Sequence, residues 1–185
     1  SGRSPEPMTA PQGKLEVLFS ASEIDARNRT LAEAIAADLG PELLLVAILK
    51  GSFVFAADLM RALHHAGLRP QVDFMTLSSY GTAVESSGRV EIRRDIDETL
   101  EGRTVLLVDD ILESGRTLAF AKAELTRRGA LVKLCVLLEK PGKRKVAIDA
   151  DYVGFVCPDK FVVGYGLDYA HYYRELPYIG VVTEG

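Results

Sequence analysis

The sequence predicts an α/β fold, in which a mostly parallel, twisted sheet is flanked by helices. Short continuous apolar runs, such as residues 43–49 and 105–108, are typical of strands that are buried on both faces. Helix-length segments with one apolar face alternate with these runs along the chain. Such alternation favours parallel strands joined by helical crossovers. The length of 185 residues suits one domain with a single core.

The elements are expected in the following order. A first helix is predicted for residues 22–39, because Ser22 can cap its start and the pair Gly40–Pro41 ends it. A buried strand then precedes a second helix, which places apolar side chains near one face. The later elements alternate in the same way. The predicted ranges are 43–49, 71–79, 104–108, 131–138, 152–156, 161–163 and 179–182 for strands, and 53–66 and 117–128 for helices.

Two stretches stand apart from this pattern. Residues 1–12 are rich in Ser, Pro and Gly, and we expect a flexible N-terminus that includes an expression remnant before Met8. Residues 13–185 are expected to form the single domain. Within it, residues 80–103 lack an apolar period, and a loop of this length in a compact domain is typical of a lid, here expected at about 80–94.

Charge and composition exclude several functions. The net charge is −4, which argues against a partner such as nucleic acid or an anionic membrane, since both require a basic surface. The one tight basic run, residues 143–145, is interpreted as a solvated loop. No apolar run approaches the ~20 residues that span a bilayer, and no signal peptide pattern is present. Cys135 and Cys157 lack metal-ligand spacing, so we predict a cytoplasmic protein in a reducing compartment.

The segment at residues 105–118 combines two chemistries. An apolar strand runs into the acids Asp109 and Asp110, and a loop containing Ser114 and Gly115 follows at the start of a helix. Hydroxyl and amide groups at a helix start can bind a phosphate, although an ordinary helix cap uses the same residues. The paired acids could form an exposed strand end, a phosphoacceptor site like that of a receiver domain, or a binding site for vicinal hydroxyls that is assisted by Mg²⁺.

The whole fourteen-residue segment resembles the phosphoribosyl-pyrophosphate motif of the type I phosphoribosyltransferases. Residues 49–59 resemble the first ligand loop of the hypoxanthine-guanine phosphoribosyltransferases within that family, and residues 159–169 and 173–180 resemble their purine-binding segment. Residues 73–75 and 78–81 match the start of their lid. Together these motifs extend over about residues 15–182. The resemblance also implies a small hood built from the N- and C-terminal segments.

The resemblance implies roles for individual residues on the donor side. Asp109 and Asp110 would hold the ribose hydroxyls, and residues 113–117 would bind the 5′-phosphate. Lys50 and Gly51, next to a cis peptide between Leu49 and Lys50, would contact the pyrophosphate. The substrate-binding residues implied on both sides are Lys50, Gly51, Ser79, Tyr80, Asp109, Asp110, Ile111, Leu112, Ser114, Gly115, Arg116, Thr117, Lys140, Phe161, Val162 and Arg174. The implied metal is Mg²⁺, with Asp168, Asp109 and Asp110 beside it.

On the base side, the resemblance changes the interpretation of three residues. Taken alone, Phe161 is typical of a core residue, Lys140 before Pro141 of a surface turn, and Asp168 of a turn acid. The resemblance instead implies that Phe161 stacks on a purine, that Lys140 donates to O6, and that Asp168 lies beside the Mg²⁺ that bridges to pyrophosphate. It also implies that Val162 contacts the purine edge through its backbone.

Glu113 departs from the family pattern. The resemblance implies a general base or proton relay at purine N7 in this position, where the family usually has aspartate. Glutamate keeps the carboxylate and adds one methylene. Because a misplacement of about 1 Å at a reacting group can cost on the order of a hundredfold in rate, the loop must compensate, or Glu113 acts through water or less directly.

The resemblance implies an enzyme of purine salvage. It would transfer the phosphoribosyl group from phosphoribosyl pyrophosphate to a 6-oxopurine, hypoxanthine and also guanine, giving IMP or GMP in a homodimer or homotetramer. Two alternative functions predict different sequence features. A regulator that keeps the fold as a nucleotide sensor would lose catalytic groups or gain a basic face. A pyrimidine or xanthine phosphoribosyltransferase would share the donor motif but not this purine segment.

Overall fold

The computed structural model describes residues 13–80 and 89–183. The expected flexible segment 1–12 and the central part of the expected lid therefore lie outside the described residues. The Leu49–Lys50 peptide bond is cis, as the resemblance implied.

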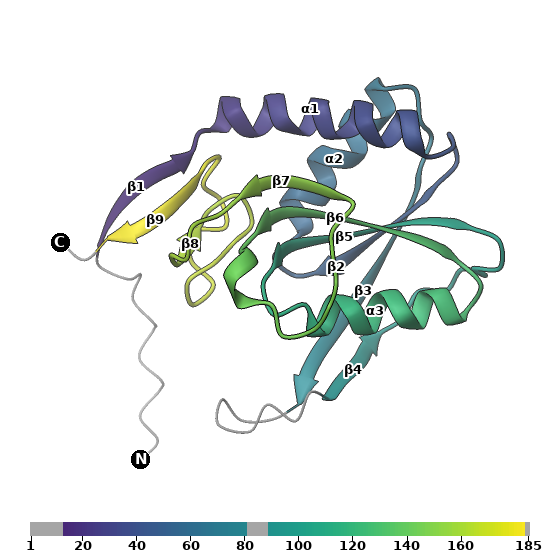
Figure 1. The fold of residues 1–185 in the computed structure, drawn as a ribbon. Helices are drawn as coiled ribbons and strands as arrows, with labels where there is room; N and C mark the ends of the chain where they lie inside the picture. The colour runs from purple at the N-terminus through teal and green to yellow at the C-terminus, as the bar shows by residue number, and fades with distance from the viewer. Residues whose placement is uncertain (1–12, 81–88, 184–185) are drawn as a thin grey trace, which may run out of the picture.

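A six-stranded sheet forms the centre of the molecule, in the order β4-β3-β2-β5-β6-β7 (Figure 1). Only β4 runs antiparallel to its neighbour, and the other neighbours are parallel. The strands are β2 (Leu44–Leu49), β3 (Gln71–Tyr80), β4 (Arg89–Arg94), β5 (Thr104–Leu112), β6 (Leu131–Glu139) and β7 (Tyr152–Val156). The fold class predicted from the sequence is confirmed.

Helices cover both faces of this sheet. Helices α1 (Ala21–Asp38) and α2 (Phe53–His65) lie on one face and α3 (Arg116–Arg127) on the other (Figure 1). The predicted cap Ser22 is wrong, because Ser20 caps α1. Its hydroxyl accepts from the Glu23 amide at 3.2 Å while its own amide donates to the Glu23 carboxylate at 3.3 Å. This reciprocal pair satisfies two amides that a helix start leaves without partners.

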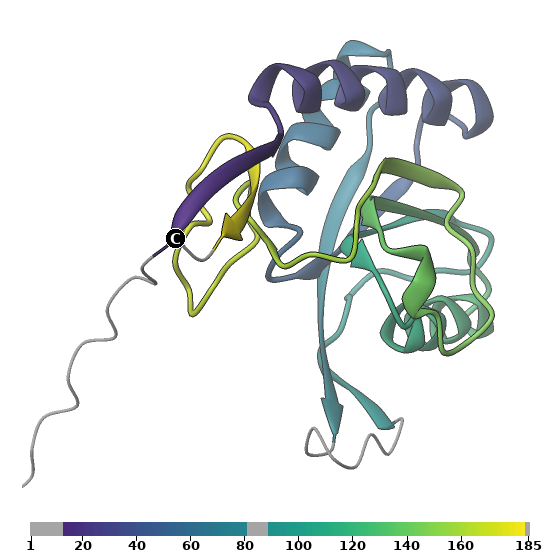
Figure 2. The ribbon, with the colours of Figure 1, turned by 60° about the vertical axis from the view of Figure 1, so that its left-hand side comes forward.

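A small antiparallel sheet stands beside the main one and forms the expected hood. It pairs β1 (Lys14–Phe19) with β9 (Ile179–Thr183), and β9 with β8 (Val162–Val163). Figure 2 shows it flanking α1 and α2, while β3 and β4 extend away from the body at the opposite end. The segment between β8 and β9 lies beside α1 and α2, because Tyr165 and residues 174–177 line one cavity together with residues of these two helices.

The core consists of two apolar layers, one on each face of the main sheet. Side chains such as Ile35 and Leu59 fill the layer under α1 and α2, and Leu107 and Leu125 belong to the layer under α3. Strand β2 is buried along almost its whole length, which explains its continuous apolar sequence. Among the described helices, none is long and apolar enough to cross a membrane.

Two predicted boundaries are corrected by the structure. Residues 89–94 are expected from the sequence within a lid loop, but they form β4, because all of them except Arg93 pair across an antiparallel ladder with β3. The strand predicted at 104–108 continues to Leu112, since Asp109 and Ile111 still pair with β6. The two acids therefore lie inside a strand rather than after it, where the sheet holds their backbone.

Candidate active site

The sequence-predicted site lies where the strand order reverses, between β2 and β5. Ligands of open α/β sheets bind at such a switch point, beyond the carboxyl ends of the strands. A cavity of about 340 Å³ is found there. Lys50 and Gly51 line it from the end of β2, and all the residues from Asp109 to Gly115 together with Thr117 line it from the β5 side. Arg116 does not line this cavity and begins α3 instead.

Asp109 and Asp110 place two carboxylates together in this cavity. The Asp110 amide donates to Asp109 Oδ1 at 2.8 Å, and the Ile111 amide donates to Asp110 Oδ1 at 2.7 Å. Burial, and then the negative charge of Asp110, hold the pKa of the Asp109 carboxyl well above its usual value. Because the two carboxylates repel one another, a ligand that carries positive charge or hydroxyl donors would stabilise their charged forms.

Gly51 makes this arrangement possible. A Cβ atom at this position would lie 2.1 Å from Asp110 Oδ2, so any larger residue would displace the carboxylate. Gly166, from the segment between β8 and β9, packs on the other side of Gly51. A Cβ atom there would lie 2.7 Å from the Gly51 carbonyl oxygen. Two glycines thus join the sheet side of the site to the C-terminal segment.

Backbone carbonyls of the loop before α3 accept hydrogen bonds from the segment that contains Arg144 and Lys145. The Ser114 carbonyl accepts from the Lys145 amide at 2.8 Å, and the Glu113 carbonyl accepts from Arg144 Nη1 at 2.7 Å. Gly115 has a φ of 84° and leads directly into the helix. A ligand in the cavity therefore meets the positive end of α3 together with the Ser114 and Thr117 side chains, an arrangement that suits an anion.

Arg144 was missed by the sequence interpretation, which treated residues 143–145 as a solvated loop. Lys143 and Lys145 are exposed, but the Arg144 guanidinium lies under the loop, where it also binds Glu139 Oε1 at 2.6 Å. No local sequence pattern distinguishes Arg144 from the two exposed lysines beside it.

Lys140 and Glu113 form an ion pair at 3.0 Å between Nζ and Oε1. Lys140 is 8% exposed, so its interpretation as a surface turn lysine is wrong. Its amide donates to the Leu112 carbonyl at 3.0 Å, which fixes the end of β6 to the end of β5. Leu112 is fully buried and offers a ligand only its backbone.

The base-side residues of the C-terminal segment differ in exposure. Phe161 is 55% exposed and meets Tyr169 edge to face, with ring centroids 5.5 Å apart, so it is not a core residue. Val162 is buried in β8, where it pairs with Val181. An exposed aromatic ring beside an ordered strand is able to stack on a planar ligand.

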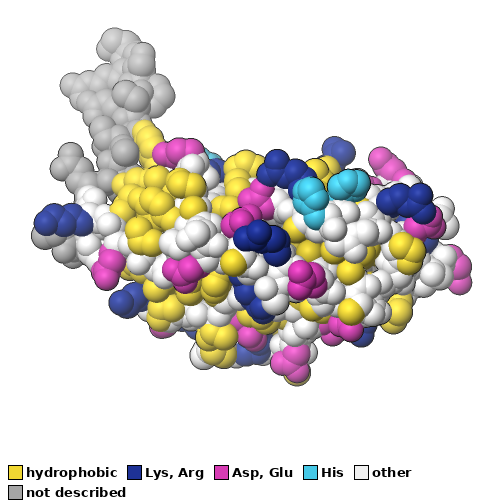
Figure 3. All heavy atoms as spheres, turned by 90° about the horizontal axis from the view of Figure 1, so that it is seen from above, with side chains coloured by type: hydrophobic (Ala, Val, Ile, Leu, Met, Phe, Trp, Pro, Cys, Tyr) yellow, Lys and Arg dark blue, Asp and Glu magenta, His cyan; other side chains and the backbone are white. Residues whose placement is uncertain are grey.

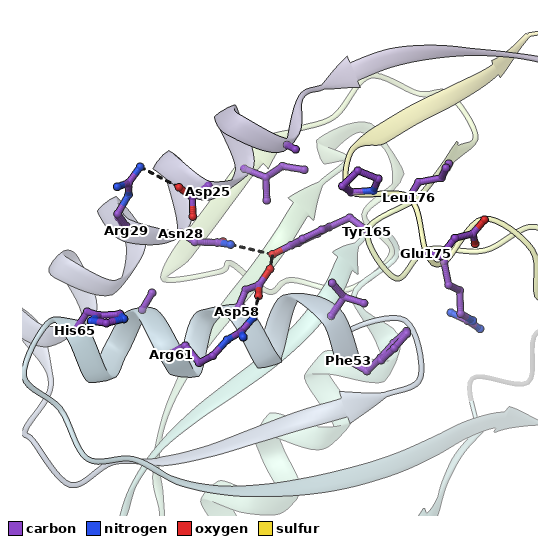
Figure 4. A pocket seen from close by; sticks show the side chains of 16 residues that line it. Asp25, Asn28, Arg29, Phe53, Asp58, Arg61, His65, Tyr165, Glu175 and Leu176 are labelled. Atoms are coloured by element: carbon purple, nitrogen blue, oxygen red, sulfur yellow. Dashed lines mark hydrogen bonds and ion pairs between the residues drawn. The ribbon is translucent and has the colours of Figure 1, made fainter.

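Arg174 and Asp168 lie together in this segment. Arg174 Nη2 is 3.5 Å from Asp168 Oδ2, and Arg174 Nη1 donates to the Gly166 carbonyl at 2.5 Å. The Asp168 carboxylate also accepts from the His171 amide at 2.8 Å, so its interpretation as a turn acid is compatible with the structure. Arg174 lines a second cavity of about 1090 Å³ between α1, α2 and the C-terminal segment (Figure 4).

Residues Ser79 and Tyr80 end β3, and the placement of their side chains lies outside the described structure. The surface over α1 and α2 carries Lys or Arg, Asp or Glu, and His side chains intermixed, and apolar side chains gather at the end next to the hood (Figure 3). On this face, neither sign of charge dominates.

The described residues contain no group of three or more His, Cys, Asp or Glu that could hold a metal ion. Mg²⁺ is usually held by one or two carboxylates together with substrate phosphates and water. The hard oxygen donors of Asp109, Asp110 and Asp168 fit this mode of binding.

Fold and site together define a class of protein. Acids and a phosphate-type loop at the switch point of a parallel sheet, with a hood beside them, are the arrangement of a nucleotide-forming transferase, and the phosphoribosyl transferase domain family matches residues 19–170. The chain is 44% identical over 173 residues to the hypoxanthine phosphoribosyltransferase of Salmonella typhimurium, covering 91% of this chain and 96% of that protein. The chain belongs to the hypoxanthine phosphoribosyltransferase family.

Two further comparisons agree. A crystal structure of a hypoxanthine phosphoribosyltransferase from Staphylococcus aureus superimposes with a TM-score of 0.85 at 41% identity, covering 91% of each chain. The bifunctional protein TilS/HprT of Listeria innocua is 46% identical over 169 residues, which is 90% of this chain. The chain spans only 26% of that longer protein.

Proposed function

We propose that this chain transfers the 5-phosphoribosyl group of phosphoribosyl pyrophosphate to hypoxanthine, and also to guanine, releasing pyrophosphate. One observation carries the proposal. A single cavity is lined by two carboxylates, by the loop at the start of α3, and by Lys50 and Gly51. A donor with a diol, a phosphate and a pyrophosphate needs these three kinds of group. Membership of the family supports the same reaction.

On the donor, Asp109 and Asp110 would accept hydrogen bonds from the ribose hydroxyls. The 5′-phosphate would be bound by Ser114, Gly115, Arg116 and Thr117, with the backbone of Ile111 and Leu112 behind it. Because the two carboxylates repel each other, they would stabilise positive charge that develops on the ribose. The proposed path is dissociative, and the protein aligns the reactants rather than forming a covalent bond.

On the base, Lys140 would donate to O6 and Glu113 would handle the proton at N7. The 3.0 Å ion pair between them suits this assignment, since O6 and N7 are adjacent on one edge of a purine. Phe161 would stack on the ring and Val162 would contact its edge through the backbone. The exposure of Phe161 supports the stacking role.

On the leaving group, Lys50, Gly51 and Arg174 would contact pyrophosphate. Mg²⁺, held by Asp168 with Asp109 and Asp110 nearby, would neutralise part of its charge when bound. We further propose that Ser79 and Tyr80, at the end of β3, form the start of a lid that excludes water. We propose that these groups belong to one domain, residues 13–185.

We also propose that the reaction takes place in the cytoplasm, in a homodimer or homotetramer. The two cysteines, Cys135 and Cys157, are both free and buried, which suits a reducing compartment. Burial raises the pKa of the Cys135 thiol to about 12, so this thiol stays protonated and unreactive at neutral pH.

The test is a steady-state comparison of hypoxanthine, guanine, xanthine and adenine as acceptors, with phosphoribosyl pyrophosphate and Mg²⁺. We expect hypoxanthine to be used well and adenine poorly, because the amino group of adenine cannot accept a hydrogen bond from Lys140. Lys140→Gln should reduce this preference. Lys143→Gln, which alters an exposed lysine paired with Asp159 at 3.1 Å, is the control. Equal rates on adenine and hypoxanthine in the unmodified protein would contradict the proposal.

A further inference from the structure

Tyr165 is a buried tyrosine that none of the proposed chemical steps uses. It is 5% exposed, and its hydroxyl lies between the two helices above the sheet. Asn28 of α1 donates from Nδ2 to Tyr165 Oη at 2.9 Å, and the Tyr165 hydroxyl donates to Asp58 Oδ2 of α2 at 2.5 Å. Figure 4 shows the ring reaching from the C-terminal segment to this pair of residues.

These contacts make the hydroxyl a permanent hydrogen-bond donor. Burial, and then the hydrogen bond to Asp58, raise the pKa of Tyr165, so the hydroxyl keeps its proton at any working pH. Asp58 is held in turn by an ion pair with Arg61. A buried polar group without its partners is costly, so this three-residue network holds the tyrosine ring in one position.

The backbone around Tyr165 needs such an anchor. Three successive residues have positive φ: 94° at Gly164, 52° at Tyr165 and 93° at Gly166. Glycine adopts this region freely, whereas a residue with a side chain rarely does. The Tyr165 amide donates to the Leu176 carbonyl at 2.8 Å, which closes the turn on its far side. The hydrogen bonds of the Tyr165 hydroxyl and of its amide thus stabilise a backbone conformation that is otherwise unfavourable for a tyrosine.

This turn connects Arg174, which lines the cavity beside α1 and α2, with Gly51, which lines the proposed site. The Gly166 amide donates to the Arg174 carbonyl at 3.0 Å, and Arg174 Nη1 donates back to the Gly166 carbonyl. On its other side, Gly166 packs against the Gly51 carbonyl so closely that no Cβ would fit. A shift of the turn therefore moves both Gly51 and Arg174.

We propose that Tyr165 is a positioning residue for the pyrophosphate side of the site, acting through Gly166 on Gly51 and Arg174. This inference rests on the proposed function. The 5′-phosphate loop before α3 is held by Arg144 and by the amides of Lys145 and Val146, without help from Tyr165. Tyr165 therefore affects one end of the donor and not the other.

The experiment measures binding to the full chain by titration calorimetry, with two probes. Inorganic pyrophosphate with Mg²⁺ reports the Tyr165 side, and IMP reports the 5′-phosphate and base sides. Tyr165→Phe should raise the pyrophosphate Kd about tenfold or more, because a small displacement of binding groups has a large effect. The Kd for IMP should change by less than about twofold, since the loop that binds its phosphate has other supports.

Tyr152→Phe is the matched control. Tyr152 is also buried, at 8% exposure, and its hydroxyl donates to Asp38 Oδ2 of α1 at 2.8 Å, but it lies on β7. Tyr152→Phe should lower the thermal stability of the protein without altering the Kd for pyrophosphate or the Kd for IMP. Asp58→Ser removes the acceptor of the Tyr165 hydroxyl and leaves the tyrosine ring intact, and it should raise the pyrophosphate Kd as Tyr165→Phe does. This second variant keeps the proposal testable if Tyr165→Phe does not fold.

Three results would overturn the role of Tyr165 alone, provided that the unmodified protein transfers the phosphoribosyl group. These are an unchanged pyrophosphate Kd in Tyr165→Phe, an equal loss for IMP and pyrophosphate, and an equal loss in Tyr152→Phe. An unmodified protein that shows no transfer would overturn the proposed function and this role together.

Discussion

The two sides of the candidate site are positioned by different means. On the sheet side, Asp109 and Asp110 lie inside β5, just beyond Val108, the last residue that pairs with β2, and next to β6, with which Asp109 and Ile111 pair. On the hood side, Asp168 and Arg174 lie in a segment without long strands, where four non-glycine residues have positive φ: Tyr165, Ala170, His171 and Tyr173. The sheet fixes its groups through many equivalent ladder bonds, whereas the hood relies on a few particular contacts. Single substitutions should therefore act locally on the sheet side and spread on the hood side.

The largest effect is expected from Asp110→Asn on the sheet side. It should lower kcat/KM by about a hundredfold or more, because it removes charge placed where the transition state becomes positive. Stability should stay equal or rise. Repulsion by Asp110 helps to raise the pKa of Asp109 in the folded protein. A carboxyl whose pKa is higher in the folded than in the unfolded chain lowers the stability once the pH exceeds its folded-state pKa. Removing the charge of Asp110 should therefore increase the stability at pH 7.

Steady-state kinetics and urea unfolding of the same preparation check this prediction. A variant that unfolds easily yet retains its turnover would contradict it, and would assign Asp110 to the fold rather than to the site.

Gly51→Ala tests the close contacts at Gly51, which lies between Asp110 on the sheet side and Gly166 on the hood side. The new Cβ would overlap Asp110 Oδ2, and the carboxylate can move aside more easily than the strand. We expect kcat/KM to fall about a hundredfold, as for other small misplacements at reacting groups, with little loss of stability. Gly40→Ala is the control, because a Cβ atom there meets nothing within 4 Å. Equal activity in the two variants would mean that the glycine contact does not position Asp110.

Glu113 allows a finer test on the base side. Glu113→Gln should lower kcat about a hundredfold if this carboxylate moves a proton. Glu113→Asp should cost about tenfold or less, because the acid is kept while the shorter side chain gives up its 3.0 Å contact with Lys140. Pre-steady-state turnover with hypoxanthine separates the two cases. Equal losses in both variants would show that reach toward Lys140, rather than proton transfer, explains the glutamate.

The sequence was informative for the sheet side and less so for the hood, and the reason is physical. Apolar runs and a contiguous motif predicted β2, β5 and the loop at Gly115, because strand burial and helix starts leave local patterns. Tyr165 and Arg144 left none, since the partners that give them their roles lie more than 25 positions away in the chain, at Asn28 and Asp58 for Tyr165 and at Glu113 for Arg144. Strand β4 was missed because its ladder with β3 depends on pairing rather than on an apolar period.

The smallest expected effect concerns the attachment of α3, which carries the phosphate loop. Arg128 at its end binds Asp95 through two hydrogen bonds, at 2.9 and 2.7 Å, and so joins α3 to the segment after β4. The hydrogen bonds from Arg128 hold the pKa of Asp95 below its usual value. Because the folded-state pKa is the lower one, this pair adds stability above the unfolded pKa of about 3.9, and the contribution is lost as the pH falls through the folded pKa.

Asp95→Asn should therefore lower the free energy of unfolding by about 0.5 to 1 kcal/mol at pH 7, a modest value because the pair is partly exposed to solvent. The difference from the unmodified protein should shrink as the pH falls through the folded-state pKa of Asp95, because the carboxyl is then protonated in both folded and unfolded chains. Urea unfolding at pH 7 and at a series of acid pH values measures this. The KM for phosphoribosyl pyrophosphate should not change, since the ladder of β5 and the contacts from Arg144 hold the loop independently of the far end of α3. A raised KM in Asp95→Asn would instead show that the sheet side, like the hood, depends on single contacts.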